Sequence, residues 1–221
     1  TQWKSRQNLA NIYLDKKQYS KALKFINEVL LIKENHQPAL RDKALILFLS
    51  NQLDEALKNI KESIKLNNKD YIAFNTLGLI LLHMLKKDEA RKIFIEAIQI
   101  NKNYAPSFSN LGRCYEALNM PEESLKCFEQ AVEIDPNSSI VINNLAGYYL
   151  DKGLYEKGLQ LYLKANSIDS SDLTVLSNIA RSYFDLDNLE LSTKYIKQCL
   201  KKDPQNDEYQ KLYCLILFKM H

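Results

Sequence analysis

The chain has 221 residues, of which 46% are hydrophobic and 26% are charged, and its formal net charge is +3. Basic and acidic residues alternate along it, which argues against the concentrated basic surface of a nucleic-acid-binding protein, so we expect no nucleic-acid partner. No apolar run approaches the roughly 18 residues of a membrane span, so we expect no membrane segment.

The sequence repeats itself every 34 residues from its first residues onward, without insertion or deletion. Position 8 of each frame holds a small residue, and positions 20 and 27 are also small in most frames. Large apolar residues recur at positions 11 and 24. Such self-similarity predicts a repeat architecture. The frames begin at Trp3, Gln37, Tyr71, Ala105, Ser139, Leu173 and Asp207.

Each frame predicts two amphipathic helices of about 14 residues, because positions 4, 7, 8 and 11 share one helical face and positions 20, 24, 27 and 28 share another. The small residues let helices approach closely, and the large ones fill the grooves between them. The prolines agree with this division. Pro38, Pro106 and Pro121 fall in first helical turns, and Pro136 and Pro204 follow helix ends.

These motifs resemble those of the tetratricopeptide repeat family. The pair Leu111-Gly112, Tyr115 three residues later and Asp135-Pro136 match its pattern, whereas Lys43 stands where leucine is usual. The resemblance implies an all-α fold, a right-handed α-solenoid of antiparallel helix hairpins whose first helices line a concave face. We expect residues 207–221 to form the first helix of a seventh repeat or a capping helix. The six full repeats are expected at residues 3–36, 37–70, 71–104, 105–138, 139–172 and 173–206.

The resemblance also predicts which side chains face the concave groove. In repeats two and three these form an apolar zone, with His83 at its edge as a partner contact or a solvated side chain. The zone either binds a partner or is covered by neighbouring helices or another segment. It consists of Leu45, Phe48, Leu49, Ile72, Leu79 and Leu82.

Repeats four to six place an asparagine at one equivalent groove position. This ladder resembles the one lining the superhelix of O-linked N-acetylglucosamine transferase, which grips a peptide backbone. A carboxamide both donates and accepts hydrogen bonds, so it can match any peptide group. The alternative is that asparagine is simply common at this position in the family. The ladder is Asn110, Asn144 and Asn178, with Asn143, Arg113 and Arg181 beside it.

No nucleophile–base arrangement, phosphate-binding loop or metal-ligand cluster is apparent in the sequence, so we predict neither an enzyme nor a bound cofactor or metal. The histidines are scattered, with His36 in a turn and His221 at the end. The cysteines form no CxxC pair. We expect reduced, buried, structural thiols and a cytoplasmic protein. The cysteines are Cys114, Cys127, Cys199 and Cys214.

The predicted function is a protein–protein interaction scaffold that binds a peptide or partner helix in the concave groove. The alternative is the substrate-presenting arm of a larger enzyme such as a glycosyltransferase. RNA binding is disfavoured by the period of 34 and the mild charge. The carboxylate clamp of chaperone-binding relatives is excluded, because no frame assembles its cations. The start at Thr1, without methionine, suggests a fragment.

The last frame supplies a first helix without a second helix to cover it. The stretch Leu212–Met220 is apolar around most of its circumference, although the end of a repeat array should be polar. Each large apolar side chain that stays in water lacks the roughly 1.5–3 kcal/mol of stabilisation that burial would give. We therefore predict a homodimer through this helix, or a chain that continues with further repeats.

Overall fold

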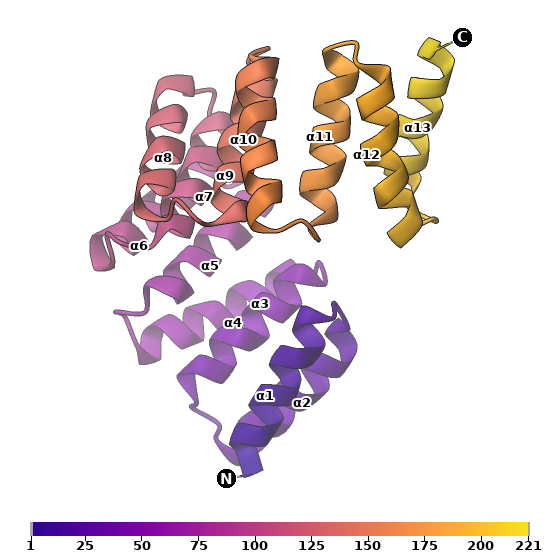
Figure 1. Cartoon of the computed structure of the whole chain (residues 1–221). Coiled ribbons are helices and arrows are strands. Elements are labelled where there is room, and N and C mark those ends of the chain that lie inside the picture. Colours follow the sequence, from indigo (N-terminus) through magenta and orange to yellow (C-terminus); the bar gives the residue numbers. More distant parts are fainter. Residues whose placement is uncertain (1, 221) are drawn as a thin grey trace. The chain divides into compact units, whose positions relative to one another are not determined.

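The computed structural model describes residues 2–220, and this part of the chain contains thirteen α-helices and no strand (Figure 1). The predicted all-α class is confirmed. None of these helices has the length and apolar composition needed to cross a lipid bilayer. The helices are α1 (Gln2–Asp15), α2 (Tyr19–Ile32), α3 (Gln37–Leu49), α4 (Leu53–Leu66), α5 (Tyr71–His83), α6 (Lys87–Ile100), α7 (Ala105–Ala117), α8 (Pro121–Ile134), α9 (Ser139–Asp151), α10 (Tyr155–Ile168), α11 (Leu173–Asp185), α12 (Leu189–Lys202) and α13 (Asp207–Met220).

The helices form two compact units, Thr1–Ser124 and Leu125–His221. In the first unit, α1–α2, α3–α4 and α5–α6 pack as hairpins, and each second helix also contacts the first helix that follows it. In the second unit, α9–α10 and α11–α12 are hairpins, and α13 packs on α11 and α12. Contacts between α3 and α5 and between α5 and α7 bring successive first helices side by side.

Every hairpin turn has a residue in the left-handed backbone region at position 15 of its repeat. In the second repeat the Asn51 amide donates to the Phe48 carbonyl, and the Gln52 amide donates to the Leu47 carbonyl. These two bonds satisfy carbonyls at the end of α3 that have no partner within the helix. Glycine, the residue that adopts this conformation without strain, occurs at only one of the six turns. The left-handed residues are Lys17, Asn51, Leu85, Asn119, Gly153 and Asp187.

The small residues at position 8 lie where the two helices of a hairpin meet. A Cβ atom added to Gly78 would lie 2.5 Å from the Phe94 ring, so α5 and α6 approach too closely for a side chain there. In the second unit, the Ser192 hydroxyl donates to the Ala180 carbonyl at 2.8 Å. The small residues therefore set the distance between the helices in both units.

The cysteines were predicted to be buried, and this is correct for Cys114 and Cys199. Burial raises the pKa of both thiols to about 11, so they stay protonated and unreactive. Cys127 is half-buried. The prediction is wrong for Cys214, which is exposed because no described helix of the second unit covers that side of α13.

Candidate functional site

The first helices α3, α5 and α7 form a hollow of about 440 Å³ in the first unit. It lies on the face that the sequence predicted to be the groove, and eight residues contribute to it. We call it the first-unit hollow. Its lining residues are Phe48, Leu49, Asn51, Leu79, Leu82, His83, Asn110 and Arg113.

One side of the first-unit hollow is apolar. Phe48, Leu79 and Leu82 are half-buried, and Leu49 is 44% exposed. The Phe48 ring meets the His83 ring edge-on, with centroids 5.1 Å apart. The contact fixes His83 at the rim, where the sequence had left its role open between partner contact and solvated side chain. Half-buried apolar side chains around a hollow retain surface that a ligand could cover.

The other side of the hollow is polar and comes from α7. The Asn110 amide nitrogen donates to the Asn75 carboxamide oxygen at 3.1 Å. This leaves the Asn110 carbonyl oxygen and a second N–H able to bond a ligand. Arg113, three residues further along α7, is exposed and forms no ion pair within residues 2–124. The hollow therefore offers a carboxamide and an unneutralised cation next to apolar side chains.

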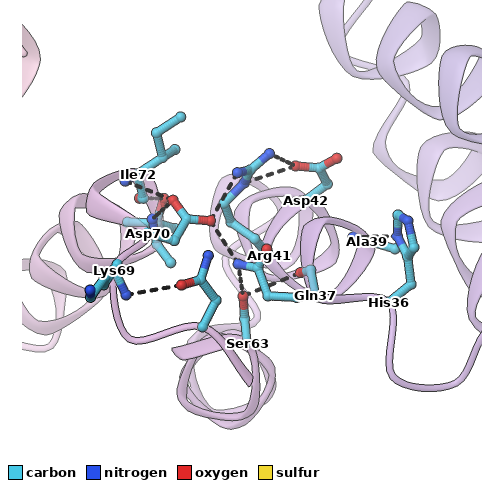
Figure 2. A network of polar contacts seen from close by, with 12 residues as sticks. His36, Gln37, Ala39, Arg41, Asp42, Ser63, Lys69, Asp70 and Ile72 are labelled. Atoms are coloured by element: carbon cyan, nitrogen blue, oxygen red, sulfur yellow. Dashed lines mark hydrogen bonds and ion pairs between the residues drawn. The ribbon is translucent and has the colours of Figure 1, made fainter. Parts of the chain in front are cut away.

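A polar network beside α3 uses the groove positions of the second repeat (Figure 2). The Arg41 guanidinium binds Asp42 at 3.1 Å and Asp70 at 3.0 Å. Gln37 donates to Asp70 at 2.6 Å and to Ser63 at 2.9 Å. Asp42 stands at position 6 of its repeat, the position that Asn110 occupies in the fourth repeat. Its carboxylate already binds Arg41 and Gln7. The network stabilises the contact between α3 and α5 and is not open to a ligand.

The charge of Asp70 is stabilised by this network. Burial by itself would raise the pKa of the Asp70 carboxyl. Hydrogen bonds from Gln37 and from the Ala73 amide, together with the charge of Arg41, outweigh burial and hold that pKa below its usual value. Asp70 also caps α5, since it accepts from the amides of Ile72 and Ala73.

A second asparagine pair lies in the second unit. The Asn178 amide nitrogen donates to the Asn143 carboxamide oxygen at 2.9 Å. The pair has the same 35-residue separation as Asn75 and Asn110, and it joins α9 to α11. Asn144 is half-buried on α9, and Arg181 is exposed on α11.

The structure brings six of the predicted groove residues together in the first-unit hollow, with His83 beside them. The six are Phe48, Leu49, Leu79, Leu82, Asn110 and Arg113. Leu45 on α3 and Ile72 on α5 are half-buried, and they do not line the first-unit hollow. Asn143, Asn144, Asn178 and Arg181 belong to the second unit.

The sequence did not predict the asparagine pairs between neighbouring repeats. Three polar pairs separated by 35 residues were the available signal: Gln7 with Asp42, Asn75 with Asn110, and Asn143 with Asn178. Each joins position 5 of one repeat to position 6 of the next. Asn110 and Asn178 thus contribute to contacts between repeats, and an asparagine ladder that grips a peptide remains a prediction.

Between residues 2 and 220, no group of three or more histidine, cysteine or acidic side chains is placed to hold a metal ion. The features that the structure does provide are contact surfaces.

The comparisons with known proteins agree with this architecture. Models of the tetratricopeptide repeat match residues 4–36, 71–104, 105–138, 127–160 and 173–206. The chain therefore belongs to the tetratricopeptide repeat family, as its motifs predicted. Among curated protein sequences, none matches this chain.

Several solved structures share the fold. A thermophilic TPR protein of Thermus thermophilus superposes with a TM-score of 0.79 at 19% identity, over 82% of this chain and 99% of its own. A chain of the APC/C hetero-tetramer Cut9–Hcn1 gives a TM-score of 0.81 at 14% identity, over 97% of this chain but only 43% of its own. YrrB, a TPR protein with an unusual peptide-binding site, gives 0.54 at 17% identity, over 84% of this chain and 96% of its own. At these identities the likeness is one of fold.

Proposed function

We propose that this protein is an interaction scaffold that binds a peptide or partner helix in the first-unit hollow. The observation that carries the proposal is the combination found there, apolar side chains on α3 and α5 together with an asparagine and an exposed arginine on α7. The family membership supports it, since tetratricopeptide repeats are typically protein-interaction modules. YrrB, which shares the fold, has a peptide-binding site.

The hollow suggests what kind of segment binds. A large apolar side chain placed against Phe48, Leu79 and Leu82 would contribute about 1.5–3 kcal/mol through burial. The unused hydrogen-bonding groups of Asn110 suit a peptide group. Arg113 suits a carboxylate, which an arginine can bind through two parallel hydrogen bonds. The favoured ligand therefore has a leucine or phenylalanine close to an aspartate or glutamate.

The polar residues of the second unit are proposed as a separate contact surface for the same class of ligand. They are Asn143, Asn144, Asn178 and Arg181. Arg181 is exposed, and Asn178 keeps a carbonyl oxygen beyond its bond to Asn143.

The test is an array of synthetic peptides that each carry one leucine or phenylalanine and one aspartate at varied spacing, followed by calorimetric titration of the best binder. Arg113→Gln should weaken binding about ten- to a hundredfold, because a hydrogen bond to a charged group contributes roughly 1.5–3 kcal/mol. Leu49→Asp, at a 44% exposed position of the hollow, should also weaken it. Binding to the wild type should weaken with salt.

Two matched controls lie on α4, outside the hollow. Lys58→Gln removes the same charge as Arg113→Gln, and Leu66→Asp changes a leucine of similar exposure, 46%. Both controls should bind like the wild type. Equal affinity for all four variants would show that the peptide binds elsewhere, and an array without any binder would overturn the proposal.

A further inference from the structure

The side chain of His36 caps α3 at the junction between the first two repeats (Figure 2). The Ala39 amide, in the first turn of α3, donates a hydrogen bond to the Nδ1 atom of His36 at 3.3 Å. Only a neutral imidazole that carries its proton on the other ring nitrogen accepts such a bond. An amide in the first turn has no partner within its own helix. The α3 cap therefore exists only while His36 is neutral.

Other first helices have caps of a different chemistry at the same repeat position, position 34. Asp70, Ser138 and Asp172 accept from amides of α5, α9 and α11. Asn206 accepts from two amides of α13. Hydroxyl and carboxamide oxygens do not titrate, and carboxylates stay ionised down to about pH 4. Among these five caps, His36 is therefore the one whose acceptor is lost between about pH 5 and pH 8.

The His36 imidazole also contacts the first repeat. Its ring centroid lies 4.7 Å from that of Trp3, at the start of α1. Trp3 packs against the apolar cluster that joins α1, α2 and α3, and Ala39 is a fully buried member of this cluster. The amide that His36 caps thus belongs to a residue that holds the first two repeats together.

A proton on His36 would disturb this junction in three ways. Nδ1 would carry a hydrogen and face the Ala39 amide as a second donor. The positive charge would lie at the start of α3, where the helix dipole disfavours a cation. It would also be repelled by Lys33, because burial and the Lys33 charge both lower the pKa of His36.

Two groups favour the protonated form, and both already have a cation beside them. The Asp42 carboxylate raises the pKa of His36, but it is bound by Arg41 at 3.1 Å. The face of the Trp3 ring attracts cations, but the Lys33 ammonium already lies 4.4 Å from its centroid. The net result is a pKa of His36 below its ordinary value. The stabilisation by neutral His36 is therefore complete above about pH 6.5 and is lost as pH falls through the folded pKa.

Few other contacts tie α1 to the second repeat. Successive first helices contact each other at α3–α5 and α5–α7, but α1 and α3 are not such a pair. The Gln7 amide bonds Asp42 at 2.9 Å, and α2 packs on α3. Since a terminal repeat has only one neighbour, local opening is expected to begin there.

We propose that His36 is a pH-sensitive cap whose protonation favours release of the first hairpin, α1–α2, from α3. Below neutral pH the array opens at this junction while the other repeats stay packed. The first-unit hollow is lined by α3, α5, α7 and the turn after α3, and by no residue of α1 or α2. The inference is therefore independent of the proposed peptide binding.

The test is hydrogen exchange of the full 221-residue chain between pH 7.5 and pH 5.5, corrected for the intrinsic pH dependence of exchange. The opening constant of α1 and α2 should rise by up to about tenfold per pH unit, the limit for one proton, whereas that of α11 and α12 should not change. Trp3 is the only tryptophan of the chain, so its fluorescence reports on the contact with His36. The fluorescence change should have the same midpoint as the change in exchange.

Two variants replace His36 with a cap that does not titrate in this range. His36→Asn copies the cap of α13, and His36→Asp copies the caps of α5 and α11. Both should keep the neutral-pH exchange and fluorescence down to pH 5.5. His83→Asn is the matched control, since His83 is an exposed histidine of α5 and its variant should respond like the wild type. Circular dichroism at pH 7.5 checks that each variant is folded.

Four results would overturn the proposal. One is an unchanged opening constant of α1 and α2 in the wild type. Another is a fluorescence change without faster exchange, because His36 would then titrate while the junction stays closed. The third is the wild-type response in both folded His36 variants, and the fourth is an equal loss of protection in all helices.

Discussion

Replacing Gly78 with alanine tests whether the small residues at position 8 set the spacing of the helices. An alanine Cβ would lie 2.5, 2.6 and 2.8 Å from three carbons of the Phe94 ring. Ordinary van der Waals contact begins near 3.4 Å, so the ring or the helix must move. Phe94 is fully buried in α6, and its ring has no solvent-facing space into which it could turn.

Two opposing effects determine how much Gly78→Ala changes the free energy of unfolding. Alanine favours a helix over glycine by about 1 kcal/mol. Overpacking a buried contact costs about 1–3 kcal/mol. Because all three close contacts are with a buried ring, we expect the cost to exceed the gain, with a net loss of up to about 2 kcal/mol in the free energy of unfolding.

Gly147→Ala is the matched control. Its added Cβ would meet only the Tyr162 hydroxyl, at 3.4 Å, so the gain in helix propensity should dominate and stabilise the protein by up to about 1 kcal/mol. Urea unfolding followed by circular dichroism gives both free energies. Hydrogen exchange should show faster opening of α5 and α6 in Gly78→Ala, because a repeat array opens locally.

A double-mutant cycle isolates the contact. Phe94→Leu should cost less in the Gly78→Ala background than in the wild type, since the smaller side chain relieves the overlap. If Gly78→Ala stabilised the protein as much as Gly147→Ala does, the close packing of α5 on α6 would be refuted.

Three further outcomes are expected. Leu85→Gly should raise the free energy of unfolding by about 0.5–1 kcal/mol in urea titrations, because Leu85 has φ 62° and is 78% exposed. Gly153→Ala should lower the free energy of unfolding by a similar amount, because Gly153 also has a positive φ. Opposite signs for the two variants would contradict the left-handed turns. Asn178→Ala should lower the free energy of unfolding by about 0.5–1.5 kcal/mol through the lost hydrogen bond to Asn143, minus the gain from alanine's higher helix propensity. Asn59→Ala is the control and should be neutral, because the Asn59 amide bonds only a carbonyl of its own helix. Equal effects of the two variants would show that the Asn143–Asn178 pair does not stabilise the fold. The folded pKa of Asp70 is lowered, so its contribution is complete above about pH 4 and is lost as pH falls through the folded value. Unfolding titrations between pH 3 and pH 7 should therefore show a smaller acid loss in Asp70→Asn than in the wild type, and an unchanged loss would contradict this assignment.

Part of the candidate site followed from the sequence, because groove-facing positions recur with the helical period. Phe48, Leu79 and Arg113 were placed in this way, and the structure finds them around one hollow. The engagement of Asp42 by Arg41 and Gln7 was not predictable. Repeat position alone does not say whether a polar side chain bonds its neighbour or stays open, since that depends on distances between helices.

The sequence by itself determined the helices and their pairing into hairpins. The 34-residue period, the small residues such as Ala44 and the boundary prolines are local features, and they act through backbone geometry and burial within one or two turns. Tertiary structure decided the features that depend on contacts between helices. It paired Asn110 with Asn75, and it left Cys214 exposed although the same position is buried in the preceding repeats. The physical reason is that the burial and hydrogen bonding of a repeat residue depend on the helix packed against it, and this neighbour differs from one repeat to the next.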